Sequence, residues 1–279
     1  MLFWKKKKEP LTPKNEIKEP QEFNTFGLND ILYYIKREIG VDLFSKNSII
    51  ETKLRLFCEK REIYSFRKLF EHIQKDTLIR QALIDLVTVN ETYFYREEEQ
   101  LALAVDFALA NSGMIKILCA PCASGEEVYS LAMMLHEKNR SAHSFSITGI
   151  DINSEAIEKA ERGVFSERSL HKLDNKLKDK FFTFQDKSFV TKKEFFSSVS
   201  FKKINIFDYD FLALGQFDII FSRNMLIYFD DEFRLKTIER FSKLLNHNGK
   251  LFLGHADIIP DNPFFTKYNN QRLSYYVKN

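Results

Sequence analysis

The stretch ILCAPCASGEEVYSLAMML, from Ile117 to Leu135, decides the fold class of this 279-residue chain. A short apolar run that ends near Ala120 is typical of a buried strand, and the small residues after it are typical of a tight loop. Behind the loop, apolar side chains recur at helical spacing, so the stretch predicts a strand, a loop and a helix. Ligands of open α/β sheets bind at the carboxyl ends of strands, which makes this loop a candidate binding site.

From this stretch to the end of the chain, short β-rich runs alternate with helical patterns. Such alternation predicts a parallel sheet with helices on both faces. Strands are expected at 115–120, 145–150, 217–221 and 250–254, and helices at 126–136, 154–162 and 231–245. The final runs, 264–268 and 273–277, have no helix between them and predict an antiparallel hairpin at the sheet edge. Three strand-like runs with Lys-rich turns in residues 181–205 are interpreted as a small β-insertion.

The first hundred residues are organised differently. Residues 1–23 are rich in Lys, Glu and Pro without apolar periodicity, which predicts a disordered tail. Residues 24–89 carry apolar side chains at helical spacing, which predicts a small all-helical domain. Residues 90–100 are polar and acidic and are interpreted as a junction to the α/β domain of residues 101–279. One predicted helix is basic on its outer faces, which carry Lys53, Arg55, Lys60 and Arg61.

Composition limits the classes of function. The chain has 42 basic and 39 acidic side chains, a formal charge of +3, which disfavours nucleic-acid binding by the whole surface. No apolar run reaches the roughly 18 residues of a membrane span, so a cytoplasmic protein without membrane insertion is expected. Cys119 and Cys122 form a Cys-x-x-Cys pair, but no second Cys or His pair lies nearby, so no metal site is expected.

Acidic residues after the loop indicate the class of cofactor. The loop has one glycine, Gly125, so it is not the G-x-G-x-x-G of dinucleotide sites. Glu126 and Glu127 follow directly, and beyond stabilising a helix N-terminus they would repel a pyrophosphate. They favour a phosphate-free, cationic cofactor, and S-adenosylmethionine has both properties. Asp151, at the end of the second strand, is a candidate acceptor for the ribose hydroxyls, with helix capping as the alternative.

Two further polar segments are candidates for the reaction centre. Arg223 and Asn224 follow the fourth strand, with Tyr228 close behind, and Asn224 and Tyr228 offer neutral hydrogen bonds there. In the NETYFYRE segment, Thr92 and Arg96 are four residues apart and share a face if the segment is helical. Arg96 could bind a carboxylate through two hydrogen bonds, although an exposed ion pair is the simpler interpretation for an isolated arginine.

Together these segments resemble one family. They are NETYFYRE (90–97), ASGEEVYSLAM (123–133), GIDINSEAIEKAERGVF (149–165), FDIIFSRNMLIYFD (217–230) and GKLFLGHAD (249–257). Their combination and order are similar to those of the chemotaxis receptor methyltransferases, the CheR family. The resemblance covers about residues 25–277. It implies a Rossmann-type methyltransferase domain with a small β-insertion, preceded by a small all-helical domain.

The resemblance also implies an activity and a set of site residues. Methyl would pass from S-adenosyl-L-methionine to glutamate side chains of chemoreceptor cytoplasmic domains, with S-adenosyl-L-homocysteine as the product. Arg96 would orient the substrate carboxylate and Tyr228 would line the methyl path, as the catalytic residues. The implied cofactor-binding residues are Asn90, Thr92, Arg96, Glu127, Asp151, Asn205, Ile206, Arg223 and Asn224. The basic helix would suit acidic receptor helices, with a simple solvated face as the alternative.

Two other functions stay open at this point. One is a methyltransferase that acts on nucleic acid, with the helical domain reading the substrate. The other is a sensor that binds the cofactor on the same fold without catalysis. A nicotinamide oxidoreductase is disfavoured by the two acids and by the missing glycines.

Overall fold

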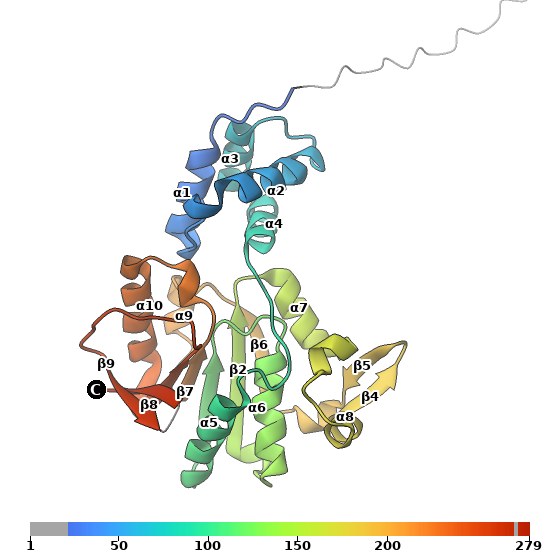
Figure 1. Ribbon diagram of the computed structural model, residues 1–279, viewed down its shortest axis with the longest axis vertical. Helices are drawn as coiled ribbons and strands as arrows, with labels where there is room; N and C mark the ends of the chain where they lie inside the picture. Colours follow the sequence, from blue (N-terminus) through green and yellow to red (C-terminus); the bar gives the residue numbers. More distant parts are fainter. Residues whose placement is uncertain (1–21, 271–272) are drawn as a thin grey trace, which may run out of the picture.

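The structure, a computed structural model, describes residues 22–270 and 273–279. It contains a Rossmann-type α/β part with a small β-insertion. A small helical part precedes it and lies over the carboxyl ends of the central strands (Figure 1). The predicted tail lies outside the described residues except for Glu22 and Phe23. Phe23 does not behave as a tail residue, because its ring packs edge-on against Phe66 with the centroids 4.9 Å apart.

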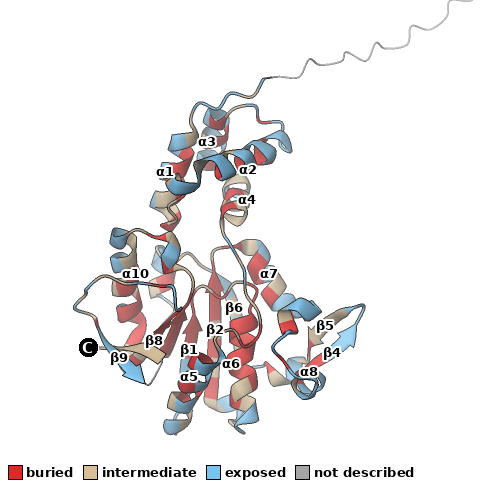
Figure 2. Ribbon diagram, viewed as in Figure 1, coloured by how far each residue is buried: buried red, intermediate tan, exposed pale blue. Residues whose placement is uncertain are grey.

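The helical part consists of α1 (Leu28–Ile39), the short η1 (Phe44–Lys46), α2 (Asn47–Glu59), α3 (Phe66–Lys75) and α4 (Thr77–Val87). Two of these helices begin at side-chain caps: Ser65 Oγ accepts from Lys68 N at 3.2 Å, and Asp76 Oδ1 accepts from Leu78 N at 2.8 Å. Such caps satisfy amide groups that a helix leaves unpaired at its start. The apolar faces of the helices meet in one cluster, seen as the red inner faces in Figure 2.

The α/β part is built on a seven-stranded sheet in the order β6-β2-β1-β7-β8-β10-β9. The parallel strands are β1 (Ile115–Cys119), β2 (Phe145–Asp151), β6 (Val199–Lys203), β7 (Phe217–Ser222) and β8 (Leu245–Leu253). The edge carries the expected antiparallel hairpin of β9 (Phe265–Asn270) and β10 (Leu273–Lys278). The helices beside the sheet are α5 (Glu98–Ala110), α6 (Glu126–Glu137), α7 (Ser154–Arg162), the short α9 (Tyr209–Leu212) and α10 (Asp231–Leu244).

The central strand β1 is buried on both faces, which explains its nearly continuous apolar sequence. Ile117 and Cys119 belong to the core that contains residues of α5 and α6. Leu118 and Ala120 belong to the opposite core, which contains residues of α9 and α10. Side chains alternate between the faces of a strand, and a parallel sheet covered by helices on both sides therefore needs apolar residues at nearly every position, with exposed Lys116 as the exception in β1.

The β-insertion begins and ends earlier in the chain than the sequence predicts. Its three strands are β3 (Val164–Phe165), β4 (Phe182–Gln185) and β5 (Ser188–Thr191), in the order β3-β5-β4, with α8 (Asn175–Phe181) beside them. The prediction that Val199–Lys203 belongs to this insertion is wrong. That strand is β6, which pairs in parallel with β2 at one edge of the main sheet. A half-exposed edge strand has the same alternating pattern as a hairpin strand, so the sequence alone could not assign its partner.

The helical part contacts the α/β part at the end of α1. Lys36 Nζ lies 2.7 Å from Asp230 Oδ2, at the start of α10. Gly40 ends α1 with φ of +77°, and its Cα faces the rings of Phe207, Phe229 and Phe233. We propose residues 24–89 and 101–279 as separate domains joined by residues 90–100, a division that limited proteolysis would test. No helix in the described ranges is long and apolar enough to cross a membrane.

We predict that Gly40→Ala destabilises the protein. A Cβ at this position would lie 2.9–3.1 Å from the three rings, and left-handed backbone adds its own cost, so a loss of about 2–4 kcal/mol is expected. Gly215→Ala is the control, because its φ is +95° but its Cβ would meet no atom within 4 Å. Denaturant unfolding measures both variants, and equal losses would show that the aromatic contact contributes nothing.

Candidate active site

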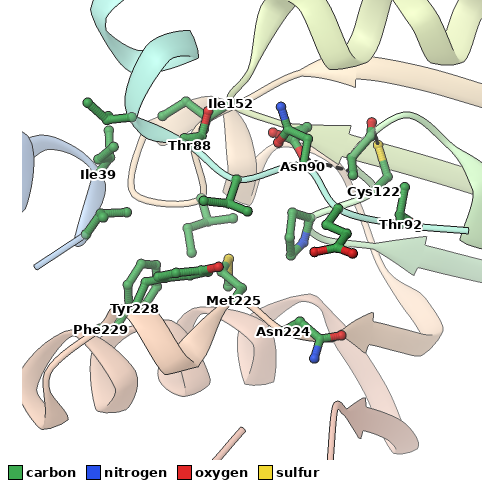
Figure 3. A pocket seen from close by; sticks show the side chains of 18 of the residues that line it. Ile39, Thr88, Asn90, Thr92, Cys122, Ile152, Asn224, Met225, Tyr228 and Phe229 are labelled. Carbon is green, nitrogen blue, oxygen red and sulfur yellow. Dashed lines mark hydrogen bonds between the residues drawn. The ribbon is translucent and has the colours of Figure 1, made fainter. Parts of the chain in front are cut away.

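A cavity of about 380 Å³ lies where the carboxyl edge of the sheet meets α1, α2 and α4. The volume is within the roughly 300–1,000 Å³ of small-molecule sites. Loops that follow β1, β2, β6 and β7 form its walls, and Figure 3 shows Thr88 and Asn90 across from Met225 and Tyr228. All the site residues predicted from the sequence line this one cavity: Asn90, Thr92, Arg96, Glu127, Asp151, Asn205, Ile206, Arg223, Asn224 and Tyr228.

A buried ion pair joins Glu127, in the first turn of α6, to Arg223, directly after β7. Arg223 Nε donates to Glu127 Oε2, and the two residues are 6% and 8% exposed. Another Arg223 nitrogen donates to the backbone oxygen of Arg96 at 2.9 Å and lies 3.5 Å from Glu97 Oε2. Among the described residues, Glu127 Oε1 has no hydrogen-bond partner although it is buried. Glu127 is also among the residues that line the cavity, so its carboxylate lies where a cation could bind.

Glu126 does not share this role, which corrects the argument from two acids. Its carboxylate is fully buried away from the cavity, where Oε2 accepts from Ser124 Oγ at 2.7 Å and Oε1 lies 3.6 Å from Lys159 Nζ. Burial raises the pKa of Glu126, and the bonds from Ser124 and Lys159 oppose that shift. Neighbouring helical residues point about 100° apart, so only one of two adjacent acids can face the ligand.

Asp151 ends β2 and is buried beside the cavity. Its Oδ2 accepts from Ala123 N at 2.8 Å and its Oδ1 accepts from Asn153 N at 2.9 Å. The cap of α7 is Asn153 rather than Asp151. Burial raises the pKa of Asp151, and backbone donors at Asn153, Ala123 and Ile152 oppose the shift. Each carboxylate oxygen accepts about two hydrogen bonds, so both can still receive a hydroxyl from a ligand.

The NETYFYRE segment reaches the cavity as an irregular turn, so Thr92 and Arg96 do not share a helical face. Phe94 anchors the segment, because its buried ring packs edge-on against Phe165 and Phe182 at 4.9 and 5.2 Å. Next to it, Tyr95 N donates to Ser130 Oγ at 3.0 Å. Arg96 Nη1 donates to Glu91 O at 2.8 Å. In the described ranges no carboxylate forms an ion pair with Arg96, which leaves its remaining donors available to a ligand.

Asp257 holds the loop that carries Asn224 and Tyr228, and sequence reasoning did not single it out. Its Oδ2 accepts from Asn224 N at 2.5 Å and Gly254 N at 3.0 Å, and its Oδ1 accepts from Ile227 N at 3.3 Å. Burial raises the pKa of Asp257, opposed by these backbone donors. The only sequence signal was its place in GKLFLGHAD, one of the stretches that carry the family resemblance.

Asn205 and Ile206 line the cavity from the loop after β6, and their positions are fixed from two sides. Asn205 Nδ2 donates to Glu38 O, at the end of α1, at 2.8 Å, and its Oδ1 accepts from Phe207 N at 3.0 Å. Arg240 of α10 donates to the backbone oxygen of Ile206. Because the Asn205 amide is already engaged, the loop offers a ligand mainly its backbone and the Ile206 side chain.

The helical part supplies further walls that were not predicted from the sequence. These are mostly apolar: Ile39, Val41, Leu43, Ile49, Ile50, Val87 and Val89. Lys46 and Lys53 add two cations, and Lys46 Nζ lies 5.5 Å from the centre of the Tyr228 ring. An apolar side chain at helical spacing looks the same in sequence whether it faces a core or a ligand, so no local signal distinguished these walls.

The residues present fit a cationic nucleoside. The unpaired Glu127 oxygen suits an ammonium, the Asp151 oxygens suit ribose hydroxyls, and the apolar walls suit a base. Residues 90–273 match the family described as "CheR methyltransferase, SAM binding domain". The chain belongs to the CheR methyltransferase family. Its cofactor is therefore S-adenosylmethionine, the ligand class that the charge of the loop indicated.

Curated relatives extend the CheR similarity beyond this domain. The chain is 40% identical over 252 residues to a chemotaxis protein methyltransferase of Campylobacter jejuni, which spans 90% of this chain and 95% of that protein. It is 36% identical over 225 residues to chemotaxis protein methyltransferase 2 of Vibrio cholerae, covering 76% and 78% of the two chains. A chemotaxis protein methyltransferase of Borreliella burgdorferi is 30% identical over 251 residues, covering 84% and 89%.

We predict that Asp257→Asn loosens the loop of this CheR protein that carries Asn224 and Tyr228. The amide keeps one acceptor, so one of the three backbone donors faces an NH₂ group, and a loss of about 1–3 kcal/mol in unfolding free energy is expected. Asp261→Asn is the matched control, an exposed residue in the same connection. Urea unfolding of both variants provides the measurement, and indistinguishable midpoints would refute the role of Asp257.

Proposed function

We propose that the chain transfers methyl from S-adenosylmethionine to glutamate side chains of chemoreceptor cytoplasmic domains, forming glutamyl methyl esters. The observation that carries the proposal is the single cavity in which the carboxylates of Glu127 and Asp151 and the side chains of Arg96 and Tyr228 meet. Family membership and the names of the chemotaxis relatives support it.

In this proposal the cofactor residues have separate tasks. Glu127 Oε1 accepts from the ammonium of the cofactor, and Arg223 holds Glu127 in place from behind. Asp151 accepts from the ribose, and Ile206 contacts the adenine. The remaining contacts come from residues whose atoms line the same cavity, Asn90, Thr92, Asn205 and Asn224, whereas Arg96, which lines it too, is assigned to the substrate.

The proposed reaction requires little proton transfer by the protein. S-adenosylmethionine supplies an electrophilic methyl group on a sulfonium. A glutamate carboxylate is already ionised at neutral pH, with an unperturbed pKa of about 4.3, so no general base is required. The protein must align the carboxylate with the methyl group and exclude water from the attacking oxygen.

Arg96 and Tyr228 suit these two tasks. The guanidinium of Arg96 has donors beyond the one used by Glu91 O, and a planar guanidinium binds a carboxylate through two parallel hydrogen bonds. Burial raises the pKa of Tyr228, with Arg96 opposing the shift, so the phenol stays neutral at pH 7. A neutral ring can line the path of the methyl group without repelling the substrate carboxylate.

We predict that Arg96→Ala lowers kcat on the order of 100-fold, because the carboxylate loses its orientation. The Kd of S-adenosylhomocysteine, measured by calorimetry, should change less than about threefold if Arg96 acts on the substrate rather than on the cofactor. Arg96→Lys keeps the charge without the planar fork and should restore only part of kcat. Equal losses in turnover and in cofactor affinity would make Arg96 a cofactor residue.

The deciding experiment for the function is transfer of labelled methyl to receptor-bearing membranes from the same cell, followed by alkali. A glutamyl methyl ester releases labelled methanol under alkali, whereas N-methyl and C-methyl products on nucleic acid do not. Alkali-stable label in nucleic acid would replace the proposal with the nucleic-acid alternative. Cofactor binding with no transfer to any receptor preparation would support the sensor.

We also propose where the receptor helices bind. Two of the four cations predicted as a docking face are engaged within the protein: Arg55 lies 5.2 Å from the Phe23 ring and Arg61 lies 3.7 Å from the Phe57 ring. The other two lie on one face of α2 and its C-cap, where two exposed apolar residues at positions i and i+7 alternate with the two lysines at i+4 and i+11. The docking stripe consists of Ile49, Lys53, Leu56 and Lys60.

The docking stripe is continuous with the cavity, because Ile49 and Lys53 also line it. Ile49 is 61% exposed and Leu56 is 53% exposed, values that are high for large apolar side chains. Alternating apolar and basic groups at helical spacing complement an amphipathic helix with acidic residues. A chemoreceptor helix that carries glutamates has this chemistry.

We predict that Lys53→Glu combined with Lys60→Glu raises the KM for receptor about tenfold or more at low salt, because steering and register are lost. The effect should shrink at high ionic strength, where exposed charges are screened. Lys68→Glu combined with Lys75→Glu on α3 is the control with the same change in charge, since both lysines are exposed outside the stripe. Equal KM values for the two double variants would show that the docking stripe does not bind the receptor.

A further inference from the structure

A side chain of the helical part caps a helix of the α/β part. Asp85 lies near the end of α4, and its Oδ1 accepts from Ser154 N, at the start of α7, at 2.8 Å. Its Oδ2 accepts from Ser154 Oγ at 2.5 Å. The first amides of a helix have no partner within the helix, so Asp85 satisfies one of them across the junction. Asn153 separately caps α7 by accepting from Ala156 N at 2.8 Å.

The contacts from α4 concentrate on three consecutive residues. Gln81 Nε2 donates to Ile152 O at 2.9 Å. Asn153 Nδ2 donates to Asp85 O at 3.1 Å and to Thr88 Oγ1 at 2.7 Å. Gln81 Nε2 also donates to Asp85 Oδ1 at 2.8 Å, which fixes the carboxylate that accepts from Ser154. Each of the residues 152–154 is therefore held by α4 or by Thr88 directly after it: Ile152 and Ser154 through their backbone and Asn153 through its side chain.

These three residues directly follow Asp151, whose Oδ1 accepts from the backbone amide of Asn153. The orientation of the Asp151 carboxylate therefore depends on where residue 153 lies. We infer that Asp85 is a positioning residue for the cofactor: its carboxylate holds Ser154, and through the neighbouring Asn153 this holds Asp151 toward the ribose. This inference rests on the ribose role proposed for Asp151.

Asp85 differs from the other residues that join the two parts. It does not line the cavity, so it has no direct contact to offer a ligand there. The Lys36–Asp230 pair and the rings around Gly40 hold α1 against α10, far along the chain from Asp151. Loss of Asp85 therefore leaves those contacts in place and removes support from the loop of Asp151. The expected consequence is weaker cofactor binding rather than separation of the two parts.

The test measures binding of S-adenosylhomocysteine and of its 2′,3′-dideoxy analogue to the full chain by calorimetry. Asp85→Ala should weaken binding of S-adenosylhomocysteine about five- to tenfold, the order expected for a lost cap bond. The dideoxy analogue lacks the hydroxyls that Asp151 would bind, so its affinity should fall less than about twofold. The kcat at saturating cofactor should stay within about twofold, and Asp85→Asn, which keeps one acceptor, should restore part of the affinity.

Asp76→Ala is the matched control, because Asp76 caps its own helix α4 through Leu78 N and contacts no residue of the α/β part through its side chain. It should leave both affinities unchanged. If Asp85→Ala does not fold, Ser154→Ala removes one of the two bonds between Asp85 and Ser154. It should weaken binding of S-adenosylhomocysteine about threefold and leave binding of the dideoxy analogue unchanged.

The outcomes separate the inference from the proposed function. If wild type prefers S-adenosylhomocysteine over the analogue and Asp85→Ala weakens both ligands equally, the positioning role is overturned while the role of Asp151 stands. An equal effect from Asp76→Ala also overturns it, since any damage to α4 would then suffice. If wild type binds both ligands equally, the ribose role of Asp151 fails, and the positioning role fails with it.

Discussion

The buried pair of Glu127 and Arg223 is the interaction on which the site depends. Removing two charges from water is costly, and an ion pair compensates for it only when the remaining donors and acceptors are also satisfied. Arg223 meets this condition through the backbone of Arg96 and the carboxylate of Glu97. The start of α6, the end of β7 and the NETYFYRE turn are thus brought together by one guanidinium. Glu127 Oε1 is buried without a hydrogen-bond partner, which supports the proposed contact with the ammonium of the cofactor.

Much of the fold could be predicted because its signals are local. The apolar run of β1, the loop behind it and the amphipathic α6 lie in one continuous stretch, and Asn153 caps α7 as its residue type suggests. The partner of a strand is not local: Val199–Lys203 has the pattern of a hairpin strand, yet it pairs with β2. The sequence also does not show which of two adjacent helical side chains faces a ligand. Glu126 points toward Lys159, whereas Glu127 faces the cavity.

The site residues illustrate the same limit at the level of chemistry. The motifs identified the polar residues that line the cavity, because polar residues at strand ends are easily recognised in the sequence. The apolar walls from α1, α2 and α4 could not be recognised, since burial against a ligand and burial against a core require the same side chains. Asp257 was missed for a related reason. Its carboxylate accepts hydrogen bonds from backbone amides, and a sequence does not show which amides a side chain will bind.

The helical part thus has two proposed tasks that share one hydrophobic cluster. Leu54 of α2 and Leu83 of α4 are both fully buried in it. The docking stripe lies on α2, and the residues that hold the loop after Asp151 lie on α4. Packed interiors resist continuous deformation, so under the proposed docking any shift of α2 on a substrate helix would be passed on to α4. Such coupling is reciprocal: whatever substrate binding does to cofactor affinity, cofactor binding does equally to substrate affinity. The contacts at 152–154 are where this coupling would enter the cofactor site.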